Sequence, residues 1–251
     1  HIGINVRSTV ATYANVHDEL RKVYARTPDA KALQYKAGDF SYNTGTLRCP
    51  TCDGTGSISL DVQFLPDVEI PCPECRGSRY SREAQLVRHG EHTLPDWMDM
   101  DVNTALEACD GMKLIRQRLQ ALKELGLGYL TLDRSASTLS TGERQRMQLA
   151  RAVRNRTTGV LYVLDEPSIG LHPSNIVGLT GVMHDLVADG NSVILVDHDT
   201  QILKEADWIV EMGPEAGAKG GYVIAEGTIP AIEKNPVSQI GPFLSGAAET
   251  K

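Results

Sequence analysis

Hydrophobic and polar positions follow two different patterns along the chain. Before Thr138, apolar residues recur at helical spacing from about Val16 to Arg26, near Val102–Cys109 and over about Met112–Leu125. A single stretch, residues 58–64, alternates apolar and polar residues in the manner of a strand. The first part of the chain is therefore expected to hold three helices and one strand within mixed and Gly-, Pro- and Cys-rich segments.

After Thr138, helical patterns alternate with continuous apolar runs. The expected helices span residues 143–155, 176–189 and 200–206, and the expected strands span residues 160–164, 192–196, 208–212 and 222–225. Apolar strands separated by helices indicate an α/β domain whose sheet is buried on both faces.

Length and charge narrow the possible classes of protein. A chain of 251 residues can hold one large domain, or a core with a smaller domain inserted. Its formal charge of −7 makes the whole chain a poor non-specific binder of nucleic acid, so any such contact has to be local. No apolar stretch approaches the roughly 20 residues of a membrane span. Because neither an initiating Met nor a signal peptide is found, we expect a piece of a longer cytoplasmic protein.

Four of the five cysteines form two close pairs, Cys49 with Cys52 and Cys72 with Cys75. Two-residue spacing lets both thiolates of a pair reach one tetrahedral ion, and glycines after each pair allow backbone N–H groups to turn toward sulfur. The pattern predicts a structural Zn²⁺ site with no open position for catalysis; buried thiols or two disulfides are the alternatives. Cys109 has no partner in this pattern and is expected in the core.

The apolar run Val160–Leu164 ends in Asp165 and Glu166. Two adjacent carboxylates at the end of a buried strand suit phosphoryl transfer, in which the first holds Mg²⁺ and the second positions the attacking water. Taken alone, the pair is equally typical of a surface turn.

Three further elements surround these carboxylates. Upstream lies a small-residue turn at the start of a helix, which forms an anion site from free N–H groups and the helix dipole. The turn consists of Ser140, Thr141, Gly142 and Glu143. Downstream, residues 168–173 form a turn, and the strand 192–196 is followed by His198, placed where a γ-phosphate oxygen can accept its hydrogen bond.

In this order the four elements resemble the signature loop, Walker B strand, D-loop and H-loop of ABC ATPases. The resemblance implies an α/β fold, an ABC-type P-loop ATPase core with an inserted zinc-binding and signature subdomain. The zinc pairs, Glu143 and several stretches narrow it to the UvrA family, among them FLPDVEIPCPECRGSRY (64–80), GLGYLTLDRSASTLSTGE (126–143) and GVLYVLDEPSIGLHP (159–173). The zinc segment is similar to the second cassette of UvrA and the signature segment to the first, which favours a divergent member such as those linked to drug self-resistance.

The resemblance also assigns roles. It implies that Ser140 and Gly142 touch the γ-phosphate of ATP held by an opposing cassette, and that Asp165 holds Mg²⁺. It implies Glu166 as the catalytic carboxylate and His198 as the γ-phosphate sensor. At position 141 the family has Gly, so the Cβ of the Thr found there would crowd the phosphate or change the loop.

The partners that the resemblance implies are duplex DNA with lesions, a second ABC cassette (in a homodimer or an intramolecular pair) and the repair helicase UvrB. It places DNA contacts at Arg76, Arg79, Arg82 and Arg88. A second group of arginines lies on the helix after the signature and forms either a basic surface or a solvated face with ion pairs. This group consists of Arg144, Arg146, Arg151, Arg154 and Arg156. The alternative functions are a drug-resistance ATPase, a transporter cassette and a DnaJ-type zinc module.

The expected division of the chain follows these roles. Residues 1–47 belong to the ATP-binding core, residues 48–138 form the zinc-binding and signature subdomain, and residues 139–251 complete the core. No G-x-x-x-x-G-K-[ST] phosphate loop occurs in the chain, so we expect that loop upstream of His1. The chain alone is therefore expected to bind and hydrolyse ATP poorly.

Overall fold

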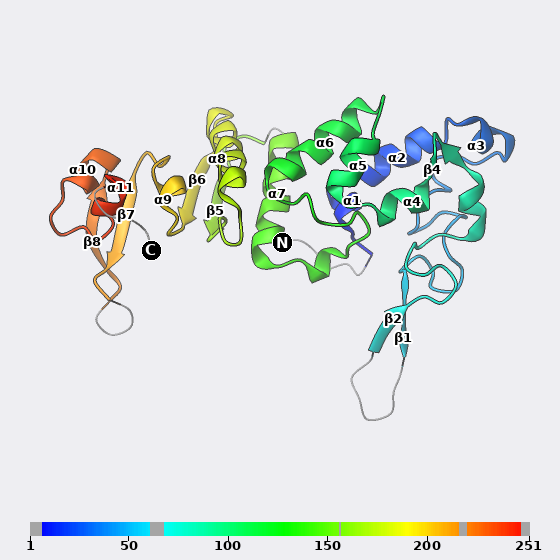
Figure 1. Cartoon of the computed structure of the whole chain (residues 1–251), viewed down its shortest axis with the longest axis horizontal. Helices are drawn as coiled ribbons and strands as arrows, with labels where there is room; N and C mark the ends of the chain where they lie inside the picture. The colour runs from blue at the N-terminus through cyan, green and yellow to red at the C-terminus, as the bar shows by residue number, and fades with distance from the viewer. Residues whose placement is uncertain (1–6, 61–67, 156, 216–219, 247–251) are drawn as a thin grey trace. The chain divides into compact units, whose positions relative to one another are not determined.

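The computed structural model describes residues 7–60, 68–155, 157–215 and 220–246 (Figure 1). The chain divides between Arg156 and Thr157 into two compact units. This boundary separates compact bodies, whereas the division expected at residues 47 and 138 is one of role in nucleotide binding and stays a prediction. Residues 7–47 belong to the same compact unit as the cysteine pairs.

The first unit is mainly helical. Its elements in chain order are α1 (Val10–Tyr13), α2 (Val16–Tyr24), α3 (Pro28–Ala32), β1 (Ser57–Leu60), β2 (Val68–Pro71), η1 (Arg82–Leu86), β3 (Arg88–His89), β4 (His92–Thr93), α4 (Leu94–Asp99), α5 (Val102–Ala108), α6 (Lys113–Glu124), η2 (Ala136–Thr138) and α7 (Thr141–Asn155). Strands β1 and β2 form an antiparallel pair, as do β3 and β4. Of the strand expected at 58–64, Val62 and Phe64 lie outside the described residues.

The core of this unit forms around α2, which packs against α4 and α6. Val16, Leu20 and Tyr24 recur every four residues and are fully buried, so one face of α2 is apolar. Each large apolar side chain removed from water in this way contributes about 2 kcal/mol. The helix ends at Tyr24, two residues before the expected end at Arg26, because Thr27 already caps α3.

The N-terminal strap, residues 8–11, is fixed to the segment that leads into α7. The N–H groups of Val10 and Ala11 donate to the carbonyls of Arg134 and Leu132, both at 2.9 Å. Thr9 continues the contact through an isolated antiparallel bridge. The strap therefore joins the beginning of the first unit to residues more than a hundred positions later in the sequence.

The second unit alternates strands and helices. Its elements are β5 (Leu161–Asp165), α8 (Pro173–Ala188), β6 (Ser192–Val196), α9 (Thr200–Leu203), β7 (Ile209–Gly213), β8 (Tyr222–Gly227), α10 (Ile229–Glu233) and α11 (Gly241–Leu244). Strands β5 and β6 run parallel, joined through α8, whereas β7 and β8 pair antiparallel. Each of these strands lies within two residues of its expected start. Helix α8 begins three residues early because His172 caps it.

Burial of both sheet faces, expected from the apolar runs, is wrong for β5 and β6. Leu164 is 4% exposed, but four apolar side chains of the pair are more than half exposed. These are Leu161 (56%), Val163 (67%), Ile194 (54%) and Val196 (60%). The reason is that, within the described residues, β5 and β6 pair only with each other, and helix α8 packs against β6. The described chain thus supplies one covering layer where the pattern predicted two.

A small separate core holds the end of the second unit together. Ile209 of β7 and Ala225 of β8 pack with buried side chains of α9, α10 and α11. Among the described residues, none of the helices is long and apolar enough to cross a membrane.

Candidate metal and nucleotide sites

Four cysteine sulfurs converge beside the β1–β2 pair. The Sγ atoms of Cys49, Cys52, Cys72 and Cys75 all lie within 4.8 Å of one another, with 3.9 Å between Cys49 and Cys72 and 3.6 Å between Cys52 and Cys75. Tetrahedral coordination with Zn–S bonds of about 2.3 Å places sulfurs roughly 3.8 Å apart. All four are free thiols, so the disulfide alternative is wrong. The donor set and its spacing suit a tetrahedral zinc ion.

Two similar turns bring the sulfurs together. The residue after each second cysteine, Asp53 or Arg76, has left-handed backbone (φ 51° and 52°). The amide of Gly56 donates to Cys52 Sγ at 3.3 Å, as expected for a turn that directs N–H groups toward sulfur. A Cβ at Gly54 would lie 1.7 Å from the carbonyl oxygen of Tyr42, so this position accepts only glycine.

Burial affects the ionisation of these thiols. It raises the pKa of Cys49, and it raises the pKa of Cys75 to about 12. At Cys52 burial acts in the same direction, but hydrogen bonds from the Gly56 amide and neighbouring groups outweigh it and lower the pKa. Buried thiols of this kind ionise fully when a bound cation compensates their charge. Cys109 is buried and donates to the carbonyl of Leu106, in keeping with its expected place in the core.

One of the four arginines expected to contact DNA is instead a structural residue. Arg79 is only 6% exposed, its guanidinium lies 5.2 Å from the centre of the Tyr42 ring, and it donates to the carbonyl of Asp133 at 3.4 Å. Its side chain holds the second cysteine turn against the helical core, so the expectation of a DNA contact is wrong for Arg79. The three exposed candidates are Arg76, Arg82 and Arg88.

In the second unit, the parallel pairing of β5 and β6 brings together the predicted carboxylates and histidine. Asp165 lies opposite Val196, and the Glu166 amide donates to the Val196 carbonyl at 2.7 Å. The Nδ1 atom of His198 then lies 3.6 Å from Oε1 of Glu166. Glu166 itself has left-handed backbone (φ 47°), a strained conformation that clusters at functional sites. The three side chains thus share one edge of the sheet.

Asp197 joins the two loops at this edge, and sequence reasoning missed it. Its carboxylate accepts hydrogen bonds from Ser168 Oγ at 2.7 Å and from the Ser168 amide at 3.2 Å. It also accepts from the amides of His198 (2.8 Å) and Asp199 (2.9 Å). An Asp directly between a strand and a predicted phosphate-sensing His was the signal that could have found it.

The signature turn forms a capping box at the start of α7, which begins at Thr141. Glu143 Oε2 accepts from the Ser140 amide at 2.6 Å, and Ser140 Oγ accepts from the Glu143 amide at 3.2 Å. The other oxygen of Glu143 accepts from the Tyr129 hydroxyl at 2.5 Å. The charge of Arg134 lies 3.7 Å away. The carboxylate of Glu143, predicted to bind nucleotide, is thus occupied by contacts within its own unit.

The surroundings of Glu143 keep it ionised. Burial raises the pKa of its carboxyl group, but the hydrogen bonds from Tyr129 and Ser140 and the charge of Arg134 outweigh burial and lower it. In the same turn Ser140 and Thr141 are exposed, whereas Gly142 is buried. The side chains that this turn offers to a ligand are therefore those of its first two residues.

At least two of the α7 arginines are held by the protein itself and do not form an open basic surface. Arg146 is 4% exposed, and Arg144 donates back to the Leu139 carbonyl at 2.7 Å. Arg156 lies outside the described residues. Arg144 and Arg146 therefore contribute to the packing of the first unit.

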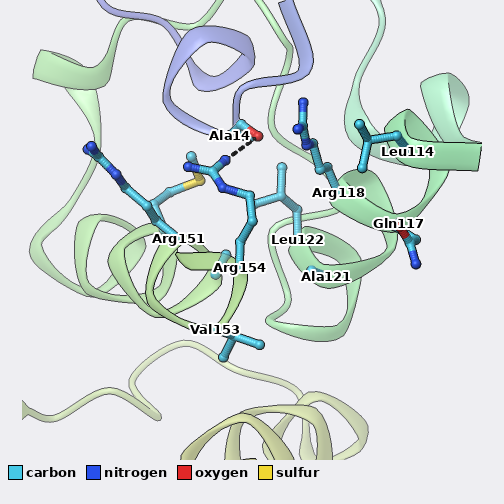
Figure 2. A pocket seen from close by; sticks show the side chains of 11 residues that line it. Ala14, Leu114, Gln117, Arg118, Ala121, Leu122, Arg151, Val153 and Arg154 are labelled. Carbon is cyan, nitrogen blue, oxygen red and sulfur yellow. Dashed lines mark hydrogen bonds between the residues drawn. The ribbon is translucent and has the colours of Figure 1, made fainter. Parts of the chain in front are cut away.

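Two more of these arginines line a groove of about 410 Å³ between α6 and α7 (Figure 2). Arg154 donates to the Ala14 carbonyl at 2.8 Å, and the guanidinium of Arg151 lies 5.5 Å from the centre of the Tyr13 ring. Burial, followed by the charges of Arg118 and Arg151, lowers the pKa of Arg154. These arginines connect α7 to the segment that follows the N-terminal strap.

Comparisons with known proteins show which proteins this chain is similar to. The ABC transporter family model matches residues 55–169. UvrABC system protein A of Streptomyces coelicolor is 44% identical over 97% of this chain and 24% of that protein, and its Bacillus subtilis counterpart is 43% identical over 99% and 26%. The crystal structure of UvrA2 from Deinococcus radiodurans superposes with a TM-score of 0.84 at 39% identity, over 99% of this chain and 31% of that one. The chain thus spans about a quarter of the length of its curated relatives.

Proposed function

Because this chain belongs to the UvrA family and has the ABC ATPase fold, we propose that it is one ATPase cassette of a UvrA-like protein that couples ATP binding and hydrolysis to recognition of damaged DNA in nucleotide excision repair. The observation that carries the proposal is the meeting of Asp165, Glu166 and His198 at one sheet edge, with 3.6 Å between the last two. The named relatives do not favour a transporter or a drug-resistance role.

The chemistry proposed for this edge is hydrolysis of the terminal phosphoanhydride of ATP. Glu166 orients a water molecule and accepts its proton while the water oxygen bonds to the γ-phosphorus. The bond from that phosphorus to the bridging oxygen breaks at the same time. His198 donates a hydrogen bond to a γ-phosphate oxygen. Asp165 would hold Mg²⁺, whose charge offsets that of the phosphates.

The signature turn is proposed to serve a nucleotide held by another cassette. Ser140 and Thr141 are exposed at the N-terminus of the fifteen-residue helix α7, where the helix dipole favours an anion. Gly142 follows them at the first turn. A second cassette, in a homodimer or within one polypeptide, is the partner that completes this site.

The zinc turns are proposed to be structural and to lie close to the DNA contacts. Cys49, Cys52, Cys72 and Cys75 would hold one Zn²⁺ that fixes both turns in place. The exposed candidates for phosphate contacts are Arg76, Arg82 and Arg88. Loading of the helicase UvrB is part of the proposed role of the whole protein.

The test uses the full-length protein that contains this chain. We expect it to hydrolyse ATP, and we expect Glu166→Gln to lower kcat by at least 100-fold, because the water loses its proton acceptor. Glu205→Gln is the matched control: this carboxylate of the same unit pairs with exposed His184 and leaves turnover unchanged.

DNA binding is measured on the same preparation. Damaged duplex should bind more tightly than undamaged duplex, with an affinity that falls steeply as salt rises. Turnover that is indifferent to Glu166→Gln, or no binding of damaged duplex at low salt, would contradict the proposal.

A further inference from the structure

Glu166 and His198 are held near each other although neither is fixed by burial. Their side chains are 46% and 76% exposed, so packing does not determine where they point. They also lie on different loops, one after β5 and the other after β6. A feature that fixes both loops at once is therefore needed to keep the 3.6 Å approach.

The Asp197 carboxylate provides that connection. It accepts two hydrogen bonds from Ser168 and one from the His198 amide, and their donor–acceptor distances run from 2.7 to 3.2 Å. Ser168 lies two residues after Glu166, and the Ile169 amide donates back to the Glu166 carbonyl at 3.1 Å. The carboxylate thus forms hydrogen bonds with both the turn that follows Glu166 and the backbone of His198. Hydrogen bonds to an ionised acceptor are about twice as strong as neutral ones.

We propose that Asp197 is a positioning residue that locks the two loops together, so that Glu166 and His198 approach the γ-phosphate as one rigid pair. The inference deepens the proposed ATPase function and rests on it. Asp197 itself touches no reacting atom; it acts through Ser168 and His198.

The kinetic test compares variants of the full-length protein. Asp197→Ala should lower kcat for ATP hydrolysis by roughly 10- to 100-fold, because misplacement of a reacting group by about 1 Å costs on the order of 100-fold. The KM for ATP should change less than twofold, since the proposed loss is one of alignment. Ser168→Ala removes one of the four donors and should lower kcat only a few-fold. The double variant, with both Asp197→Ala and Ser168→Ala, should have the same kcat as Asp197→Ala alone, because both substitutions break the same contact.

Asp199→Ala is the matched control. Its carboxylate lies two residues away and caps α9 through the Gln201 amide at 2.8 Å. Asp199→Ala should leave kcat unchanged, although it removes a hydrogen bond between a carboxylate and a backbone amide, as Asp197→Ala does. If Asp197→Ala fails to fold, Asp197→Asn keeps one acceptor oxygen and the same volume and should give a smaller decrease in kcat.

A second readout needs no nucleotide. Amide hydrogen exchange should speed up at Ser168 and His198 in Asp197→Ala, and only at Gln201 in Asp199→Ala. Wild-type kcat in Asp197→Ala, or unchanged exchange at Ser168 and His198, would overturn the inference. A parent protein without ATP turnover would remove the proposed function, and the exchange measurement would still decide whether Asp197 locks the loops.

Discussion

His17 is a buried titratable residue in the core of the first unit. Its ring lies 4.6 Å from that of Tyr42, and its Nε2 atom lies 2.6 Å from the hydroxyl of Tyr80. Burial, followed by the positive charges of Arg21 and Arg79, lowers its pKa to about 3. The folded protein therefore keeps this imidazole neutral.

The His17 pKa predicts a loss of stability in acid. Below about pH 6.5 the unfolded chain binds a proton that the folded chain accepts only near pH 3. As the pH falls through this range, His17 should thus lower the free energy of unfolding by up to about 1.4 kcal/mol per pH unit. Urea unfolding at pH 7, 6 and 5 should show a shallower pH dependence for His17→Phe than for the wild type. His184→Gln changes an exposed histidine and should keep the wild-type slope; equal slopes for all three would contradict the prediction.

At the scale of single residues, the sequence alone predicts the role of a residue when its partners are close along the chain. The cysteine pairs and the Asp165–Glu166 pair stand out because each is a local pattern. Asp197 does not, because its main partner Ser168 is 29 residues away. The interior place of Arg79 was equally hidden, since it depends on an aromatic ring brought to it by the fold.

Among the elements, the two cysteine turns offer the most direct chemical test. The purified protein should contain about one zinc ion per chain, and Cys52→Ser or Cys72→Ser should lower the zinc content and the Tm, because a lost thiolate leaves an incomplete tetrahedral site. Metal analysis and thermal unfolding measure both effects.

Cys109→Ser is the control for this experiment. It changes a buried thiol away from the turns and should keep the metal. Intact wild-type protein without metal would end the zinc proposal.

Element prediction succeeded where the hydrophobic pattern was long. Helices α2, α6 and α8 were all expected, because each presents an apolar stripe over several turns. Helices α1, α3 and α4, which are four to six residues long, were missed. Their threonine caps, Thr9, Thr27 and Thr93, were the available signal.

At the scale of the whole molecule, the ABC fold was correctly predicted from four ordered motifs. The error concerned the environment of the sheet. Continuous apolar strands indicated two covering layers, and the described residues supply one. A hydrophobic pattern specifies that a surface will be covered, but it does not identify which segment covers it.

The chain by itself is expected to turn over ATP poorly. It contains no G-x-x-x-x-G-K-[ST] sequence, whose backbone amides and lysine would hold the β- and γ-phosphates. Turnover and ATP affinity should be compared between this chain and the full-length protein, with Glu166→Gln as the control for background activity. Robust hydrolysis by the chain alone, abolished by Glu166→Gln, would contradict this expectation.

The N-terminal strap has a consequence for how the protein is made. Within the described residues each sheet joins strands that are neighbours in sequence, so these sheets are able to form soon after their strands leave the ribosome. Val10 and Ala11, by contrast, are fixed by carbonyls of Arg134 and Leu132. Those partners are synthesised more than a hundred residues later. The strap is thus synthesised well before the residues that hold it, and until they emerge the nascent chain carries an open first unit.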